Sequence, residues 1–222
     1  MNVDVWGRVE TLAQHIENKF RLAGLEIEEP SDYGWKNSLF TSYNFRRAHI
    51  EIVDNRDSHK LYILHCTVFP HFDDPAPIWG FDAVCGPNKI TGAFHDFSMP
   101  AYSEHPMAQW WAMTSSQYQW HKPRQLPEWA QAIFSKNMVA AGNVNTEEEL
   151  DAICNLAEQA LDYYLENVGD TRHFRSSFKE NQNIYCRYQK QNPHVVRSMV
   201  SMGVPEDKMR KFVDEVLFPE SA

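Results

Sequence analysis

The sequence RRAHIEIV at residues 46–53, followed by KLYILHCTVFPHFDDPAPIWGFDAVCGPNKITGAFHDFSMP at residues 60–100, decides the fold. It contains four short runs rich in β-branched and aromatic residues, separated by turn-forming residues, which is typical of strands. Because the connections are short, neighbouring strands are expected to pair antiparallel. Four ionisable side chains stand inside these otherwise apolar runs: His49, Glu51, His65 and Asp82.

The segments on either side of this block have helical features. Residues 6–24 carry apolar side chains at a spacing near 3.6 and end at a glycine. Thr146 and the three glutamates after it form a capping box, and the helix they open is expected to end near Val168. Two further helices are expected to begin at Asn192-Pro193 and after Pro205, since proline is favourable in a first helical turn.

The remaining segments complete the expected architecture. Residues 25–45 are predicted to be irregular or extended, and a further strand is expected at 134–140. Helices before and after a continuous antiparallel sheet predict an α+β fold, with helices covering the sheet. Without a low-complexity linker, residues 1–222 are interpreted as one domain.

The ionisable residues within the strands predict a proton-handling pocket. Side chains alternate between the two faces of a strand, so His49 and Glu51 point the same way. Gly80 beside Asp82 leaves room for a bulky ligand against the sheet. Burying such groups is costly unless they are paired or used, and an apolar site raises a carboxyl pKa towards neutrality. Two histidines and two carboxylates on one apolar face would therefore form a proton donor site.

Other sites are less favoured by the spacing of these residues. A buried His or Asp taken singly is usually structural, and a metal site would lack HxxxH or HExxH spacing. A hydrolytic pair of Cys66 with a distant histidine has no local signature. No GxGxxG or GxxxxGK[ST] motif indicates a nucleotide or flavin site. The four cysteines, at positions 66, 85, 154 and 186, have neither zinc nor iron–sulfur spacing. Cys66 and Cys85 stand in strand-like runs and are interpreted as core residues.

Charge is distributed unevenly along the chain. The formal net charge of −9 argues against general binding to nucleic acid or to anionic membranes. The segment 171–200 nevertheless has six basic residues and one acid, which suits docking of a small acidic partner, although a solvated helix face is the plainer interpretation. Five of its cations are predicted to contact that partner: Arg172, Arg175, Lys179, Arg187 and Lys190.

The N-terminus bears acidic residues and has no apolar signal-peptide core. Apolar runs are also shorter than the ~20 residues that span a bilayer. A cytoplasmic location is expected.

The run LHCTVFPHFDDPAPIWGFDAVCGPNKITGAFHDFS resembles the core motif of the ferredoxin-dependent bilin reductases. The similarity extends over about residues 40–219 and is closest to the branch that makes phycocyanobilin. It implies a three-layer α/β/α sandwich with a central antiparallel sheet. Four further blocks carry it: RRAHIEIV, KPRQLPEW at 122–129, NIYCRYQKQN at 183–192 and VLFPE at 216–220.

The resemblance implies a substrate, an electron donor and a set of roles. The substrate would be biliverdin IXα, and reduced [2Fe–2S] ferredoxin would supply electrons singly, with no metal or organic cofactor in the reductase. Asp82 matches the aspartate that protonates the bilin, His65 the histidine paired with it, and Glu51 the glutamate near the D-ring vinyl group. His49 matches a histidine of the supporting hydrogen-bond network. Substrate-binding positions would be Thr91, Arg124, Asn192 and His194.

Two departures from the family pattern bear on the product. The chain has DFSMP where the family often has DLSP, and Pro193 and His194 replace the Asp and Lys of the phycocyanobilin branch. Relatives that make phycoerythrobilin carry Asp at the position of Glu51, so Glu51 favours four-electron reduction to phycocyanobilin. The alternatives are reduction to phycoerythrobilin and a bilin-binding protein without catalysis.

Overall fold

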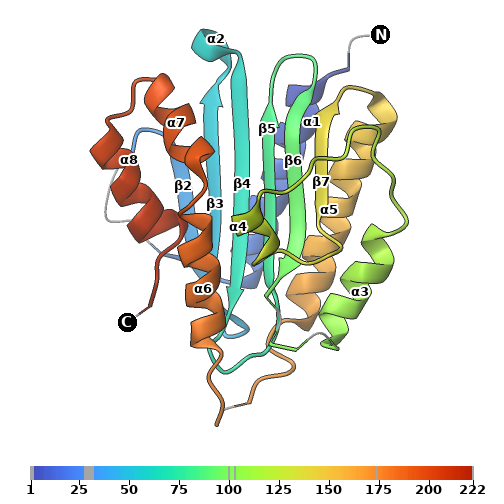
Figure 1. The fold of residues 1–222 in the computed structure, drawn as a ribbon, viewed down its shortest axis with the longest axis vertical. Coiled ribbons are helices and arrows are strands. Elements are labelled where there is room, and N and C mark those ends of the chain that lie inside the picture. Colours follow the sequence, from blue (N-terminus) through green and yellow to red (C-terminus); the bar gives the residue numbers. More distant parts are fainter. Residues whose placement is uncertain (1–2, 28–32, 100, 103, 174, 222) are drawn as a thin grey trace.

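A computed structural model describes residues 3–27, 33–99, 101–102, 104–173 and 175–221. In this part of the chain, seven strands form one sheet in which every neighbouring pair is antiparallel and the spatial order follows the sequence (Figure 1). The strands are β1 (Leu25–Ile27), β2 (Lys36–Thr41), β3 (Phe45–Asn55), β4 (Leu61–Pro70), β5 (Ile78–Cys85), β6 (Ile90–Ser98) and β7 (Val139–Val144).

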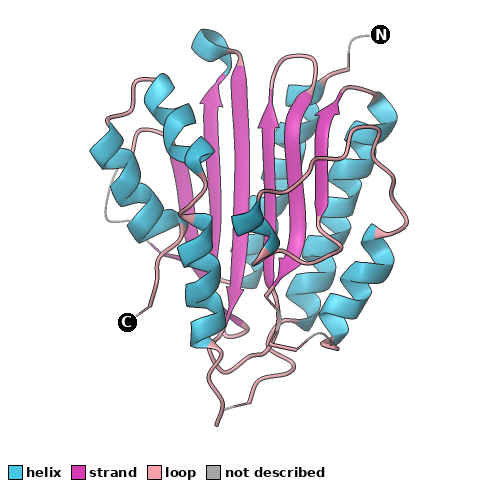
Figure 2. Ribbon diagram, viewed as in Figure 1, coloured by secondary structure: helices cyan, strands magenta, loops and turns pink. Residues whose placement is uncertain are grey.

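Helices cover both faces of this sheet, as Figure 2 shows. One layer contains α1 (Val5–Ala23), α3 (Pro106–Ser115) and α5 (Glu147–Asn167). The opposite layer contains α4 (Glu128–Gln131), α6 (Lys179–Gln189), α7 (Pro193–Ser201), α8 (Glu206–Phe212) and the π-helical turn η1 (Val213–Leu217). The short α2 (Arg56–His59) joins β3 to β4. The α+β prediction, with helices on a central antiparallel sheet, is confirmed.

The two helical layers enclose two different cores. Behind the sheet, Phe20 of α1, Trp79 of β5 and Leu161 of α5 are fully buried in one continuous apolar cluster. In front of it, Phe69 of β4 and Phe212 of α8 belong to a second cluster. Because successive strand residues point to opposite faces, one sheet supplies both cores. The front core is the one that surrounds the functional residues.

Local sequence explains where the long helices begin and end. The Thr146 hydroxyl accepts the Glu149 backbone N–H at the start of α5, as the capping box predicts. Beyond the end of α5, Gly169 has φ +95° and packs against Asn44, a conformation and a space that favour glycine. Gly24 follows α1 for a different reason, since a side chain there would collide with the carbonyl oxygen of Thr41.

One expectation about the segments outside the central block needs correction, and a second becomes more specific. The strand expected at 134–140 is β7 and begins later, because residues 128–138 form α4 and the turns that follow it. The segment 25–45 contains β1 and β2 on the edge of the sheet, and its residues 28–32 lie outside the described chain.

Candidate active site

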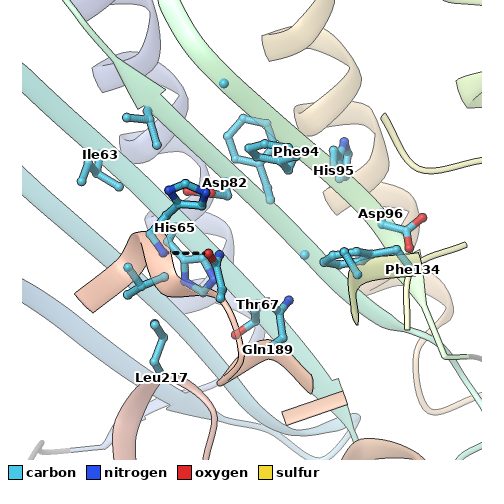
Figure 3. A pocket seen from close by; sticks show the side chains of 18 of the residues that line it. Ile63, His65, Thr67, Asp82, Phe94, His95, Asp96, Phe134, Gln189 and Leu217 are labelled. Atoms are coloured by element: carbon cyan, nitrogen blue, oxygen red, sulfur yellow. Dashed lines mark hydrogen bonds between the residues drawn. The ribbon is translucent and has the colours of Figure 1, made fainter. Parts of the chain in front are cut away.

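Three neighbouring strands bring the predicted pocket residues into one row. Glu51 of β3 is paired with His65 of β4, and His65 is paired with Asp82 of β5. Phe94 of β6 extends the row. Directly paired residues of adjacent strands share a face, so these side chains lie next to one another. Figure 3 shows His65 and Asp82 together on the cavity wall.

This row forms the floor of a cavity of about 400 Å³. Its size falls in the range of small-molecule sites, roughly 300–1,000 Å³. The cavity lies between the sheet and the front helices, and seven of the eight predicted catalytic and substrate-binding residues line it; His49 does not. Its apolar and aromatic lining includes Phe94, Trp129, Phe134, Tyr185, Leu217 and Phe218.

The apolar cavity changes the acidity of Asp82. Burial raises its pKa from 3.8 to about 7, because a carboxylate loses hydration in the apolar cavity. No side chain in the described part of the chain donates a hydrogen bond to its carboxyl to offset that loss. A group that titrates near neutrality can be both protonated and deprotonated within a catalytic cycle.

The raised pKa of Asp82 predicts a pH-dependent stability difference. An acid with a higher pKa in the folded state adds stability that is complete below its unfolded-state pKa and is lost as the pH rises through the folded-state pKa. For Asp82 that window runs from 3.8 to about 7. In chemical denaturation without ligand, Asp82→Asn should therefore gain stability over wild type across this window, by a few kcal/mol at about 1.4 kcal/mol per pKa unit. A stability difference between the variant and the wild type that stays constant from acid to neutral pH would contradict a raised pKa for Asp82.

The two histidines are held neutral. Burial, together with the positive charge of Arg47, lowers the pKa of His65 to about 4. Burial, Arg47 and His65 lower the pKa of His49 well below its ordinary value. A neutral imidazole can relay a proton with no net change of charge, when one ring nitrogen takes up a proton and the other releases one.

His49 lies outside the cavity and supports its wall. Its Nε2 is 3.1 Å from Oδ1 of Asn37, whose amide nitrogen donates to the Trp35 carbonyl. Since Oδ1 can only accept, Nε2 of His49 carries the hydrogen in this assignment. The ring packs near those of His65 and Phe212, at centroid distances of 6.2 and 6.3 Å.

Arg124 and Thr91 lie at one edge of the cavity. The exposed Arg124 guanidinium donates to the Thr91 carbonyl at 2.9 Å and lies over the Phe94 ring. Gly92 and Gly142 leave the space that the Arg124 side chain occupies, because a side chain at Gly142 would come within 2.9 Å of Nε of Arg124. An arginine fixed in this way offers its remaining N–H groups to a carboxylate. The Thr91 hydroxyl donates to the Val84 carbonyl, so its oxygen remains an acceptor.

Asn192 and His194 lie at the start of α7. The Asn192 side chain accepts the His194 backbone N–H at 3.0 Å, which caps the helix that Asn192-Pro193 was predicted to open. Both residues line the cavity. These two polar residues form the edge of the cavity that lies opposite the sheet.

The basic segment is partly neutralised by acids from elsewhere in the chain. Arg172 pairs with Asp73 at 3.0 Å. Arg187 and Lys190 both pair with Glu220, each at 3.1 Å. Arg175 is exposed and has no ion pair among the described residues. The net positive face is therefore smaller than the count of basic residues indicates.

Sequence reasoning missed several polar groups of the site. Trp35 donates to Glu51 at 2.7 Å, and the Gln189 amide donates to the Tyr185 hydroxyl at 2.8 Å in the cavity wall. Asp96, also in the wall, is buried and accepts bonds from the side chains of three residues: Ser98, Trp111 and Ser135. Burial raises the pKa of Asp96, and these bonds act against that shift. Side chains alternate along β6, and Phe94 is paired with Asp82, so Asp96 lies on the same face of the sheet as Asp82. This alternation is the feature of the sequence from which Asp96 could have been predicted as a site residue.

Within the described ranges, no group of three or more His, Cys, Asp or Glu side chains is arranged to hold a metal ion. No helix in those ranges is both long and apolar enough to cross a bilayer. All four cysteines are free and buried.

The chain belongs to the ferredoxin-dependent bilin reductases, a family of oxidoreductases, whose sequence model matches residues 5–219. It is similar to a phycocyanobilin:ferredoxin oxidoreductase of Prochlorococcus marinus, with 31% identity over 82% of this chain and 74% of that one. The enzyme of the same name from Trichodesmium erythraeum is 26% identical over 83% of this chain and 71% of that one.

Solved structures show the same fold. The structure of PcyX is 25% identical and superimposes with a TM-score of 0.71 over 96% of this chain and 99% of that chain. Tomato phytochromobilin synthase, crystallised with biliverdin, is 13% identical, with a TM-score of 0.70 over 94% of this chain and 82% of that chain.

Proposed function

We propose that this protein reduces biliverdin IXα to phycocyanobilin, taking four electrons singly from reduced [2Fe–2S] ferredoxin. The observation that supports this most is Asp82, whose pKa is raised to about 7 on the floor of a cavity of about 400 Å³, beside His65. A reductase that receives only electrons from its partner also needs a proton source at the bilin, and Asp82 is suited to that role near neutral pH. Membership of the family and the names of the relatives support the same assignment.

Different site residues bind the substrate and supply protons to it. Asp82, paired with neutral His65, protonates the bilin so that each incoming electron adds to a conjugated system without leaving excess negative charge. Glu51 supplies a proton at the D-ring vinyl group. Arg124 binds one propionate as a charge-assisted pair, and Asn192 and His194 bind polar groups on the opposite edge.

The product is the point on which two reductase hypotheses differ. Glu51 favours vinyl reduction and so phycocyanobilin, whereas reduction elsewhere on the bilin would give phycoerythrobilin. Biliverdin, the protein and a ferredoxin-reducing system should be mixed without oxygen, and the product identified by absorbance and co-chromatography. Phycocyanobilin supports the proposal and phycoerythrobilin selects the alternative. A complex with unchanged bilin would identify a binding protein.

Docking of the electron donor is expected at the basic segment 171–200. Arg175→Glu with Lys179→Glu should lower kcat/KM for ferredoxin several-fold at low salt, with little change near 0.5 M salt, because exposed charges act on association and are screened. Lys60→Glu, which reverses one charge at the opposite end of the sheet, after α2, is the control, to be compared with each single variant of the pair (Figure 1). Equal rates for the double variant and the control would place docking elsewhere.

A further inference from the structure

One carboxylate oxygen of Glu51 is held from outside the cavity. Trp35 Nε1 donates to Glu51 Oε1 at 2.7 Å, and Glu51 is only 5% exposed. Glu51 lines the cavity, whereas Trp35 does not. A short bond between an N–H group and a buried carboxylate is among the stronger hydrogen bonds in proteins. It fixes the orientation of a side chain that otherwise has three rotatable bonds.

Trp35 is itself fixed by packing. Its ring contacts Tyr33 at a centroid distance of 5.7 Å and Phe212 of α8 at 5.1 Å. Tyr33 also contacts Phe212, at 4.7 Å. The indole therefore stands in an aromatic cluster between the edge of the sheet and α8, so it can hold Glu51 at little further entropic cost.

The register explains how Trp35 reaches this position. Asn37 of β2 is paired with Glu51 of β3, so Trp35, two residues before Asn37, meets Glu51 on a diagonal. Diagonal neighbours lie within reach of a large aromatic side chain. Asn37 contacts His49 across the same diagonal offset, two residues along β3 from its direct partner Glu51. β2 and the residue just before it thus supply partners to two residues of the site.

We propose that Trp35 is a positioning residue of the reductase, which holds one oxygen of Glu51 so that the carboxyl group faces the bilin in a single orientation. The inference rests on the proposed function for the role of Glu51. A purely structural Trp35 would stabilise the fold without affecting the step that depends on Glu51.

The kinetic test uses Trp35→Phe, which keeps an aromatic ring and removes the N–H donor. It should lower kcat for formation of the vinyl-reduced product about 10-fold, the value of one hydrogen bond to a charged group, with KM for biliverdin nearly unchanged. In the Glu51→Gln background the same change should cost much less, because coupled residues are not additive. The matched control is Trp120→Phe, since the Trp120 ring is half-buried and stacks on Tyr118. The proposal would be overturned if the effects of Trp35→Phe and Glu51→Gln on kcat were fully additive. It would also be overturned if Trp120→Phe lowered kcat as much as Trp35→Phe does.

A second readout does not depend on turnover. The indole Hε1 resonance of Trp35 is assigned by its loss from the ¹H–¹⁵N spectrum of Trp35→Phe. It should lie downfield in the wild type and move upfield in Glu51→Gln, where the acceptor is neutral. An unmoved resonance would show that the two groups are not bonded. If the wild type makes no bilin product, the proposed function fails and Trp35 has no catalytic role, while this shift still decides whether the contact exists.

Discussion

Asp82→Asn is expected to slow bilin reduction by at least ~100-fold, the usual loss when a general acid is removed, while biliverdin still binds. The amide keeps the size of the side chain but has no carboxyl proton to deliver. In the wild type the protonated form is the active one, so the rate should fall as the pH rises above about 7. Stopped-flow absorbance during a single turnover measures both effects, and binding is measured separately by titration of the bilin absorbance.

A surface variant separates loss of the acid from loss of one negative charge. Asp57→Asn changes an exposed aspartate in α2 and should react at the wild-type rate. Phycocyanobilin formed by Asp82→Asn at the wild-type rate would remove Asp82 from the mechanism.

Glu51→Gln is expected to change what the protein makes. The glutamine amide oxygen can still accept the Trp35 bond, so the side chain should keep its position. It has no proton to give, and reduction of the D-ring vinyl group should fall by about 100-fold. The bilin released or trapped should retain that vinyl group, because under the proposed mechanism Asp82, beside His65, would still protonate the rest of the molecule.

Mass spectrometry and proton NMR of the bilin identify the vinyl group. Glu10→Gln, which changes a partly exposed acid of α1, is the matched control. Phycocyanobilin in normal yield from Glu51→Gln would show that the vinyl proton comes from another group.

The central strands could be predicted because their pattern is local. Alternation fixed the shared face of His49 and Glu51, and antiparallel pairing placed Glu51, His65 and Asp82 opposite one another. The segment 25–45 was predicted only as irregular or extended, because β1 has three residues and β2, KNSLFT, mixes polar and apolar residues without a strong period. The Trp35–Glu51 bond depends on the position of the residue just before β2 and was therefore also missed.

The prediction of the basic docking surface was limited because it could not include ion pairs between residues far apart in the sequence. Arg187 and Lys190 were predicted to be available for docking, whereas Glu220 reaches them only after the chain folds back from α8 and η1. The positions of Arg124, Asn192 and His194 at the cavity came from the family resemblance, since nothing in their local sequence indicates a ligand. Burial, which sets the pKa of Asp82, is a property of the packed helices and not of any motif.

The most direct test of the account is a turnover in D₂O with biliverdin and chemically reduced ferredoxin, under anaerobic conditions. If electrons come singly from the partner and protons come from exchangeable side chains such as Asp82, every hydrogen newly bonded to carbon in the product should be deuterium. Mass spectrometry after back-exchange of the N–H groups measures this. A reduced bilin whose new carbon-bound hydrogens are protium would show hydride transfer from another donor, and no reduced bilin at all would contradict the proposed activity.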